Sequence, residues 1–300
     1  MRVARTPAQR AQGQFDTFLF ADYSGAESAT AQRSAISLFR VDGPTGEPRK
    51  IVGPFTRTTL RETIVEELRQ ATSEGRRVLF GLDHQWSWPR DLKDVAGLGG
   101  ANWRTFLATL VSGTKSLPPL GAPSEYACAF NAATGQPVFH CRVHSLGHKY
   151  GLPRSSAWPG NPVRLVETLM SGAKPATRLG GTGAVAGQTL TGLKELHLLF
   201  QETTRRTLPV KAWPFDVLHD DGVSHLGCEI YPAYCKRDLK ARGLFRTRPD
   251  WTEHDRDAAL TSLWASRTDL APLLDLRKET KSTQTMARTE GWILGARGKA

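Results

Sequence analysis

The sequence has little of several features that would assign the protein to a particular class. It has four cysteines in 300 residues, too few for a disulfide scaffold, and this number fits a reducing cytoplasm. It contains no run of about 18 apolar residues, so we expect no transmembrane helix and no membrane partner. The basic N-terminus lacks the apolar core of a secretory signal. A Gly-x-Ser-x-Gly elbow is absent, and the glycine-rich stretch 179–189 lacks the Gly-Lys-Ser/Thr ending of a P-loop.

Acidic residues are also scarce relative to basic ones. Lys and Arg number 40 against 29 Asp and Glu, a net charge of +11. This balance favours a polyanionic partner, first of all DNA or RNA. Residues 149–211 alone hold nine Lys or Arg and three Glu. We expect them to form a basic wall that holds phosphates. The candidate nucleic-acid contacts are Lys149, Arg154, Arg164 and Lys194, with Trp86 stacking on a base or, alternatively, packing in the core.

The order of apolar runs predicts an α/β fold. Strands are expected at 16–22, 34–41, 50–55, 76–83 and 225–231, and helices at 59–73, 102–112, 162–171, 191–203 and 253–266. Residues 1–14 carry three arginines and no acid, which predicts a disordered basic tail. This order is what an RNase H-like mixed sheet with helices on both faces would need. We therefore expect a core formed by residues 15–95 and 216–296, interrupted by a large, basic, partly helical insertion at 96–215.

Two of the expected strands end on an aspartate. Asp22 closes the run in FLFADYSGA, and Asp83 closes the run in VLFGLD. If the two strands are parallel neighbours, both acids leave the sheet at its carboxyl edge, where open α/β sheets place their sites. Glu229 lies inside the apolar run HLGCEIY, and a charge in such a run needs a partner or a metal.

In the last expected helix, WTEHDRDAALTSLW, Asp255 and Asp257 lie on different faces. Asp257 shares a face with the apolar Leu260 and Trp264, which predicts an inward side chain. Asp255 falls three residues after Thr252, the spacing of a capping box. His254 shares the face of Asp257 and is a candidate to donate a proton or to orient a phosphate.

Carboxylates that lie close together repel one another unless a cation neutralises them. We therefore expect Asp22, Asp83, Glu229 and Asp257 to bind two Mg²⁺ or Mn²⁺ ions, with Asp22 bridging both. Such a pair of ions activates water and stabilises the leaving oxygen in phosphodiester hydrolysis.

The stretches FADYSGA, GLDHQWSWP, CEIYPAY and HDRDAALTSL resemble the motifs of the DUF429 family, predicted nucleases of RNase H-like fold, and the likeness spans residues 16–295. The resemblance implies a metal-dependent nuclease with the same four acids at its site. The pair His254-x-x-Asp257 is similar to the His-x-x-Asp pair on the last helix of RuvC-type resolvases.

Two alternatives remain open. An actin-like ATPase or sugar kinase would also use acids at strand ends, but it would need a duplicated second half, which the sequence does not display. A nucleic-acid-binding subunit without catalytic activity would keep the basic surface alone. The sequence does not distinguish DNA from RNA, or endonuclease from exonuclease.

Overall fold

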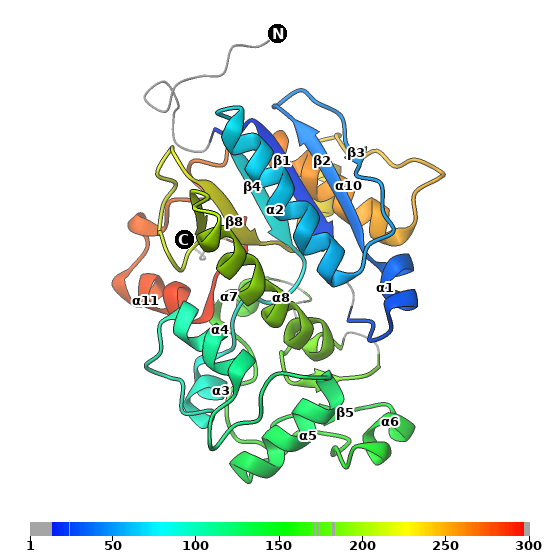
Figure 1. Cartoon of the computed structure of the whole chain (residues 1–300), viewed down its shortest axis with the longest axis vertical. Coiled ribbons are helices and arrows are strands. Elements are labelled where there is room, and N and C mark those ends of the chain that lie inside the picture. Colours follow the sequence, from blue (N-terminus) through cyan, green and yellow to red (C-terminus); the bar gives the residue numbers. More distant parts are fainter. Residues whose placement is uncertain (1–13, 24, 171, 173, 182–183, 297–300) are drawn as a thin grey trace.

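One mixed sheet of six strands organises the structure, a computed structural model that describes residues 14–296 except 24, 171, 173 and 182–183 (Figure 1). The strand order is β3-β2-β1-β4-β8-β7. β1 is antiparallel to β2 and parallel to β4, and β8 is parallel to both β4 and β7. The strands are β1 (Thr17–Asp22), β2 (Ser37–Asp42), β3 (Arg49–Lys50), β4 (Val78–Leu82), β7 (Val210–Ala212) and β8 (His225–Glu229).

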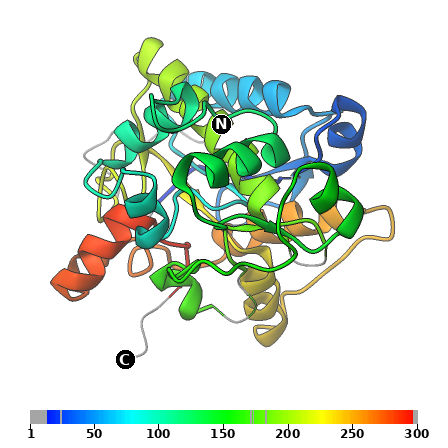
Figure 2. The same ribbon diagram turned by 90° about the horizontal axis from the view of Figure 1, so that it is seen from below.

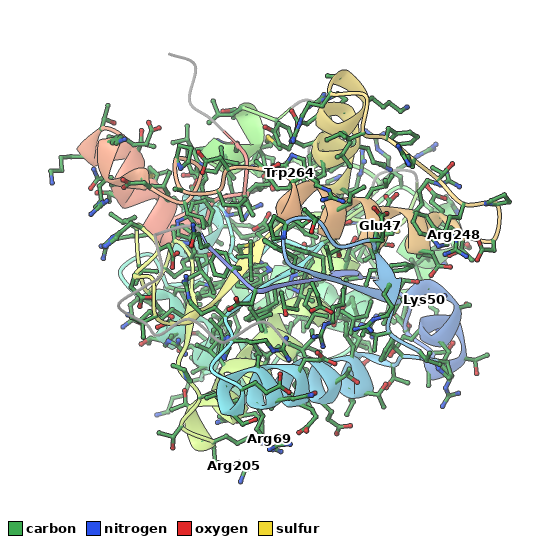
Figure 3. All side chains as sticks on the ribbon, turned by 90° about the horizontal axis from the view of Figure 1, so that it is seen from above. Glu47, Lys50, Arg69, Arg205, Arg248 and Trp264 are labelled. Carbon is green, nitrogen blue, oxygen red and sulfur yellow. The ribbon has the colours of Figure 1, made fainter. Side chains whose placement is uncertain are left out.

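Helices cover both faces of this sheet, which confirms the predicted α/β class. On one face lie α2 (Arg57–Ser73) and α8 (Ala186–Arg205); on the other lie α9 (Pro232–Ala241) and α10 (Glu253–Ser266). Figure 3 shows Arg69 of α2 and Trp264 of α10 on opposite sides of the sheet. Successive residues of β1 point to opposite faces, so Leu19 packs on the α2 side and Phe20 packs on the α10 side.

The remaining helices are short and connect or flank this sandwich. They are α1 (Ala29–Ala35), α3 (Arg90–Val95), α4 (Trp103–Ser112), α5 (Pro123–Thr134), α6 (His144–Lys149), α7 (Leu165–Thr168), α11 (Lys281–Glu290) and a 3₁₀ turn at Leu276–Lys278. Strands β5 (His140–Cys141) and β6 (Arg178–Leu179) form a separate parallel pair. The chain passes from the end of β4 into α3, and α3 to α6 lie beyond that end of the sheet (Figures 1 and 2).

The segment 96–215, expected as an insertion, is part of the main core. Its helix α8 packs against α2, and its strand β7 extends the sheet by pairing with β8. The apolar cluster on the α2 side continues from β1 and β4 into α4, α5 and α8 without a break. Residues 95 and 216 therefore do not mark boundaries between two separate hydrophobic cores.

Several local expectations need correction. The run 34–41 begins with the end of α1, and among the described residues of the helix expected at 162–171 only 165–168 are helical. The helix expected at 59–73 begins earlier, at Arg57, because Thr56 caps its start with Thr59 as the reciprocal partner. The basic tail expected at 1–14 lies almost entirely outside the described residues. No helix in the described part of the chain has both the length and the apolar character needed to span a membrane.

Candidate active site

The parallel register of β1 and β4 brings Asp22 and Asp83 together. Ala21 pairs with Leu82, so the two aspartates occupy the next position of neighbouring strands. The backbone N–H of Asp83 donates to the carbonyl of Ala21 at 3.3 Å. Both side chains leave the sheet on the face covered by α9 and α10, because Ala21 and Leu82 point to the α2 face. The predicted pairing of acids at two strand ends is therefore present.

Helix α10 adds His254 and Asp257 to these acids. It packs on β1 and β2, and its first turn lies over the end of β1. His254 Nδ1 contacts Oδ2 of Asp22, and this hydrogen bond raises the pKa of His254. Asp257 is half-buried in the same neighbourhood, where desolvation raises its pKa and the negative charge of Asp22 adds to the effect.

Asp83 is the most crowded carboxylate of the group. Desolvation raises its pKa well above the usual value, and the negative charges of Asp22, Asp257 and Glu229 raise it further. Each of the other three acids has a cationic partner: Asp22 has His254, Asp257 has Lys236 and Glu229 has Arg164. Among the described residues, no cationic side chain forms an ion pair with Asp83. A negative charge in these surroundings requires either a proton or an added cation.

Glu229 is held on the opposite face of the sheet. In the register of β4 and β8 it pairs with Leu82 rather than Asp83, so its side chain points away from the two aspartates. Arg164 donates to both carboxylate oxygens, at 2.6 Å to Oε2, and the backbone N–H of Trp86 donates to Oε2 at 2.9 Å. The charge inside the apolar run thus has an arginine partner, and these contacts favour a structural role for Glu229.

Arg164 and Trp86 do not reach the surface. Arg164 is 0% exposed and also donates to Glu167 at 2.9 Å and to the carbonyl of Glu290 at 3.2 Å. Trp86 is 0% exposed and stacks on Trp103, with ring centroids 6.2 Å apart. The expectation that they contact nucleic acid is wrong in this structure, since neither side chain is accessible. Lys149, Arg154 and Lys194 are exposed, as that role requires.

The start of α10 confirms that Asp255 caps the helix, as predicted, while Asp257 does not. Thr252 accepts from the backbone N–H of Asp255, and Asp255 accepts from that of Thr252. Asp255 also accepts from Ser37 Oγ and from Lys50 Nζ, both at 2.7 Å. Figure 3 labels Lys50 at the edge strand β3. Asp255 is therefore occupied with the sheet and the cap, while Asp257 faces the other acids.

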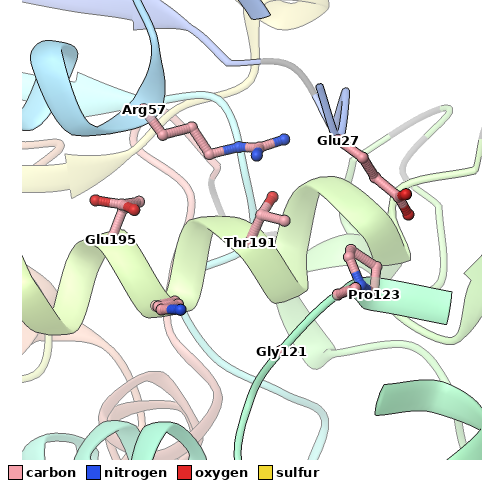
Figure 4. Close-up of a pocket in the computed structure, with 8 residues that line it drawn as sticks. Glu27, Arg57, Gly121, Pro123, Thr191 and Glu195 are labelled. Atoms are coloured by element: carbon pink, nitrogen blue, oxygen red, sulfur yellow. The ribbon is translucent and has the colours of Figure 1, made fainter. Parts of the chain in front are cut away.

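A hollow of about 240 Å³ lies on the α2 side of the loop that follows β1. Its lining includes Glu27, Arg57, Thr191, Lys194 and Glu195 (Figure 4). Figure 4 shows the Arg57 guanidinium extending above Thr191 toward Glu27. Glu195 is paired with Arg61 of α2.

This hollow shares structural elements with the acid site. Gly25, three residues after Asp22, lies so close to α8 that a Cβ there would come within 2.9 Å of the backbone nitrogen of Gln188. Gln188 in turn donates to the carbonyl of Asp83. The loop after β1 and the first turns of α8 therefore support both features. Sequence reasoning named Lys194 but missed Arg57 and Thr191, which belong to no recognisable motif.

The fit of this site to a divalent metal is incomplete. No group of three or more His, Cys, Asp or Glu in the described ranges is arranged to hold a metal ion. Asp22 and Asp83 nevertheless offer carboxylate oxygens, the ligands that Mg²⁺ and Mn²⁺ prefer, at the place where negative charge is least compensated. They are the residues that would hold such an ion.

Comparison of the chain with family models, with curated proteins and with solved structures finds no match.

Proposed function

We propose that the protein is a divalent-metal-dependent nuclease that hydrolyses phosphodiester bonds at Asp22 and Asp83. The observation that carries this proposal is the charge pattern: three acids have their own cationic partners, and Asp83 beside them has none among the described residues. Mg²⁺ or Mn²⁺ would supply the missing charge. A bound divalent ion of this kind polarises a phosphoryl oxygen and lowers the pKa of a coordinated water.

The sheet supports the RNase H-like fold as part of the proposal. A central β1 flanked by antiparallel β2 and parallel β4, with β8 following β4, fits that arrangement. The acids at the ends of β1 and β4 then lie where such sheets place their ligands.

His254 is suited to proton transfer beside these acids. Its Nδ1 is held by Asp22, which fixes the ring and favours the protonated form. The side chain is 37% exposed, so the second ring nitrogen has access to solvent or substrate. A protonated imidazole in this position can donate a proton to a leaving oxygen, the role of a general acid.

A nucleic-acid substrate agrees with the surroundings of the site. The net charge of +11 favours a polyanion, and Arg57 and Lys194 place positive charge in the hollow behind the loop of Asp22. Lys149 and Arg154 add exposed cations on and after α6. Such side chains bind phosphates without reading the sequence of bases.

The test is cleavage of labelled single-stranded, duplex and branched DNA and of RNA, with Mn²⁺, Mg²⁺ or EDTA. Asp22→Asn and Asp83→Asn should abolish metal-dependent cleavage, since each removes a carboxylate that would hold the ion. Asp250→Asn is the matched control, because this exposed acid forms its ion pair with Arg248, away from the proposed site, and its replacement should leave cleavage unchanged. Binding without cleavage, unaffected by EDTA, would instead support a nucleic-acid-binding subunit.

A further inference from the structure

Lys236 places an ammonium group directly on one of the acids expected to bind metal. Its Nζ lies 2.8 Å from Oδ1 and 3.0 Å from Oδ2 of Asp257, so it contacts both carboxylate oxygens. Lys236 belongs to α9, which packs along α10. The two side chains are largely shielded from solvent, with exposures of 27% and 18%.

A second divalent ion would need ligands besides Asp22 and Asp83. The two remaining acids of the expected set are Glu229 and Asp257. Glu229 lies on the other face of the sheet and is bound by Arg164 and Trp86. Asp257 is bound by Lys236 through both oxygens. No acid of the set therefore remains for a second ion.

We propose that the Lys236 ammonium takes the place of the second divalent ion, so that the site binds one metal ion per chain. This inference rests on the proposed function, and it replaces the two-ion mechanism expected from the sequence with a one-ion mechanism assisted by lysine. An ammonium is a compact point charge with three N–H donors. Two of them reach Asp257, which leaves one for a phosphate oxygen of the substrate.

The charge of Lys236 should also keep a second ion away. A divalent cation near Asp257 would meet a positive charge already in contact with its ligand, and like charges at this separation repel strongly where solvent is limited. Replacing Lys236 with methionine removes the charge but keeps an unbranched side chain. The carboxylate of Asp257 then becomes available as a ligand.

The experiment counts Mn²⁺ ions bound to the metal-free protein, from the loss of the free-ion signal in electron paramagnetic resonance titrations. We expect one ion for the wild type and two for Lys236→Met, with the second site tightened by about tenfold or more, a change of about 1.4 kcal/mol. Lys236→Arg keeps the charge and should bind one ion. Lys240→Met, one turn further along α9 and exposed, is the matched control and should also bind one.

The number of Mn²⁺ ions bound distinguishes a failure of this inference from a failure of the proposed function. Two ions on the wild type would overturn the role of Lys236 and leave a metal-dependent nuclease in place. No ion on the wild type would overturn both. A single ion on a folded Lys236→Met, verified by circular dichroism, would show that the ammonium does not exclude the second ion. If Lys236→Met does not fold, the counts for the wild type and Lys236→Arg still decide, since two ions on either contradict the inference.

Discussion

Replacement of Arg164 by methionine should destabilise the protein markedly, because this arginine neutralises two buried glutamates. Arg164 is fully buried and donates to Glu167 and Glu229. Removing one partner of a buried ion pair costs about 3–5 kcal/mol, because it leaves an uncompensated charge away from water. At about 2.1 cal/mol/K per residue, the unfolding entropy of a 300-residue chain makes 1 kcal/mol equal to about 1.6 °C. The melting temperature should therefore fall by about 5–8 °C.

The assay is thermal unfolding followed by circular dichroism at pH 7. Arg154→Met provides the control, since Arg154 is exposed and surface changes usually stay within about 0.5 kcal/mol. Adding Glu229→Gln to Arg164→Met should restore part of the loss, because the orphaned charge is removed. The reasoning would be refuted by an Arg164→Met variant that melts like the wild type but binds nucleic acid more weakly, which would place Arg164 on the binding surface.

Three further predictions concern the acids and the basic surface. Asp83→Asn should stabilise the metal-free protein at pH 7. The raised pKa of Asp83 means that folding is penalised increasingly as pH rises above the unfolded value of about 3.9, and fully above the folded pKa, so the gain should disappear below about 3.9. Melting curves from pH 3 to 8 would show this. If the variant were less stable than the wild type at pH 7, the neighbouring negative charges would not destabilise the fold through Asp83. For His254→Gln the sign is opposite: the raised pKa of His254 contributes stability below its unfolded value of about 6.5, and this contribution is lost as pH rises through the folded pKa. Urea unfolding should therefore separate the variant from the wild type at pH 5.5 more than at pH 9, and a difference independent of pH would refute the pairing with Asp22. Changing Lys149, Arg154 and Lys194 together to glutamine should lower the slope of log K against log salt by about 2–3 if each contacts one phosphate. An unchanged slope would exclude all three.

The elements that sequence reasoning predicted well are those fixed by local patterns. The apolar runs of β1 and β4, each closed by an aspartate, lie where expected within one or two residues, and α10 spans 253–266 as predicted. The Thr252–Asp255 capping box fixes the start of α10. The helical spacing of its apolar residues predicts that the side chain of Asp257 points inward. Such signals act within a few residues, so the sequence displays them directly.

The features that sequence reasoning missed depend on residues far apart in the chain. The sequence shows that Glu229 needs a partner, but it does not show that the partner is Arg164, 65 residues earlier. That follows only from the fold, which brings the start of α7 to the end of β8. The face on which Glu229 lies depends on the register of β4 and β8, and a shift of one residue would reverse it. Lys236 was overlooked because α9 was not predicted. Trp86 shows a related limit, since an aromatic side chain can fill a core as well as stack on a base.

The contribution of β7 and α8 to the main sheet has a consequence for attempts to shorten the protein. A truncated chain without residues 96–215 would keep all the acids of the proposed site. It would also strip β8 of the neighbour whose Ala212 pairs with Gly227, and it would uncover the apolar side chains of α2 that α8 buries. An exposed strand edge of this kind is a template for pairing with other chains. Excision of residues 96–215 should therefore produce aggregates rather than a smaller folded protein.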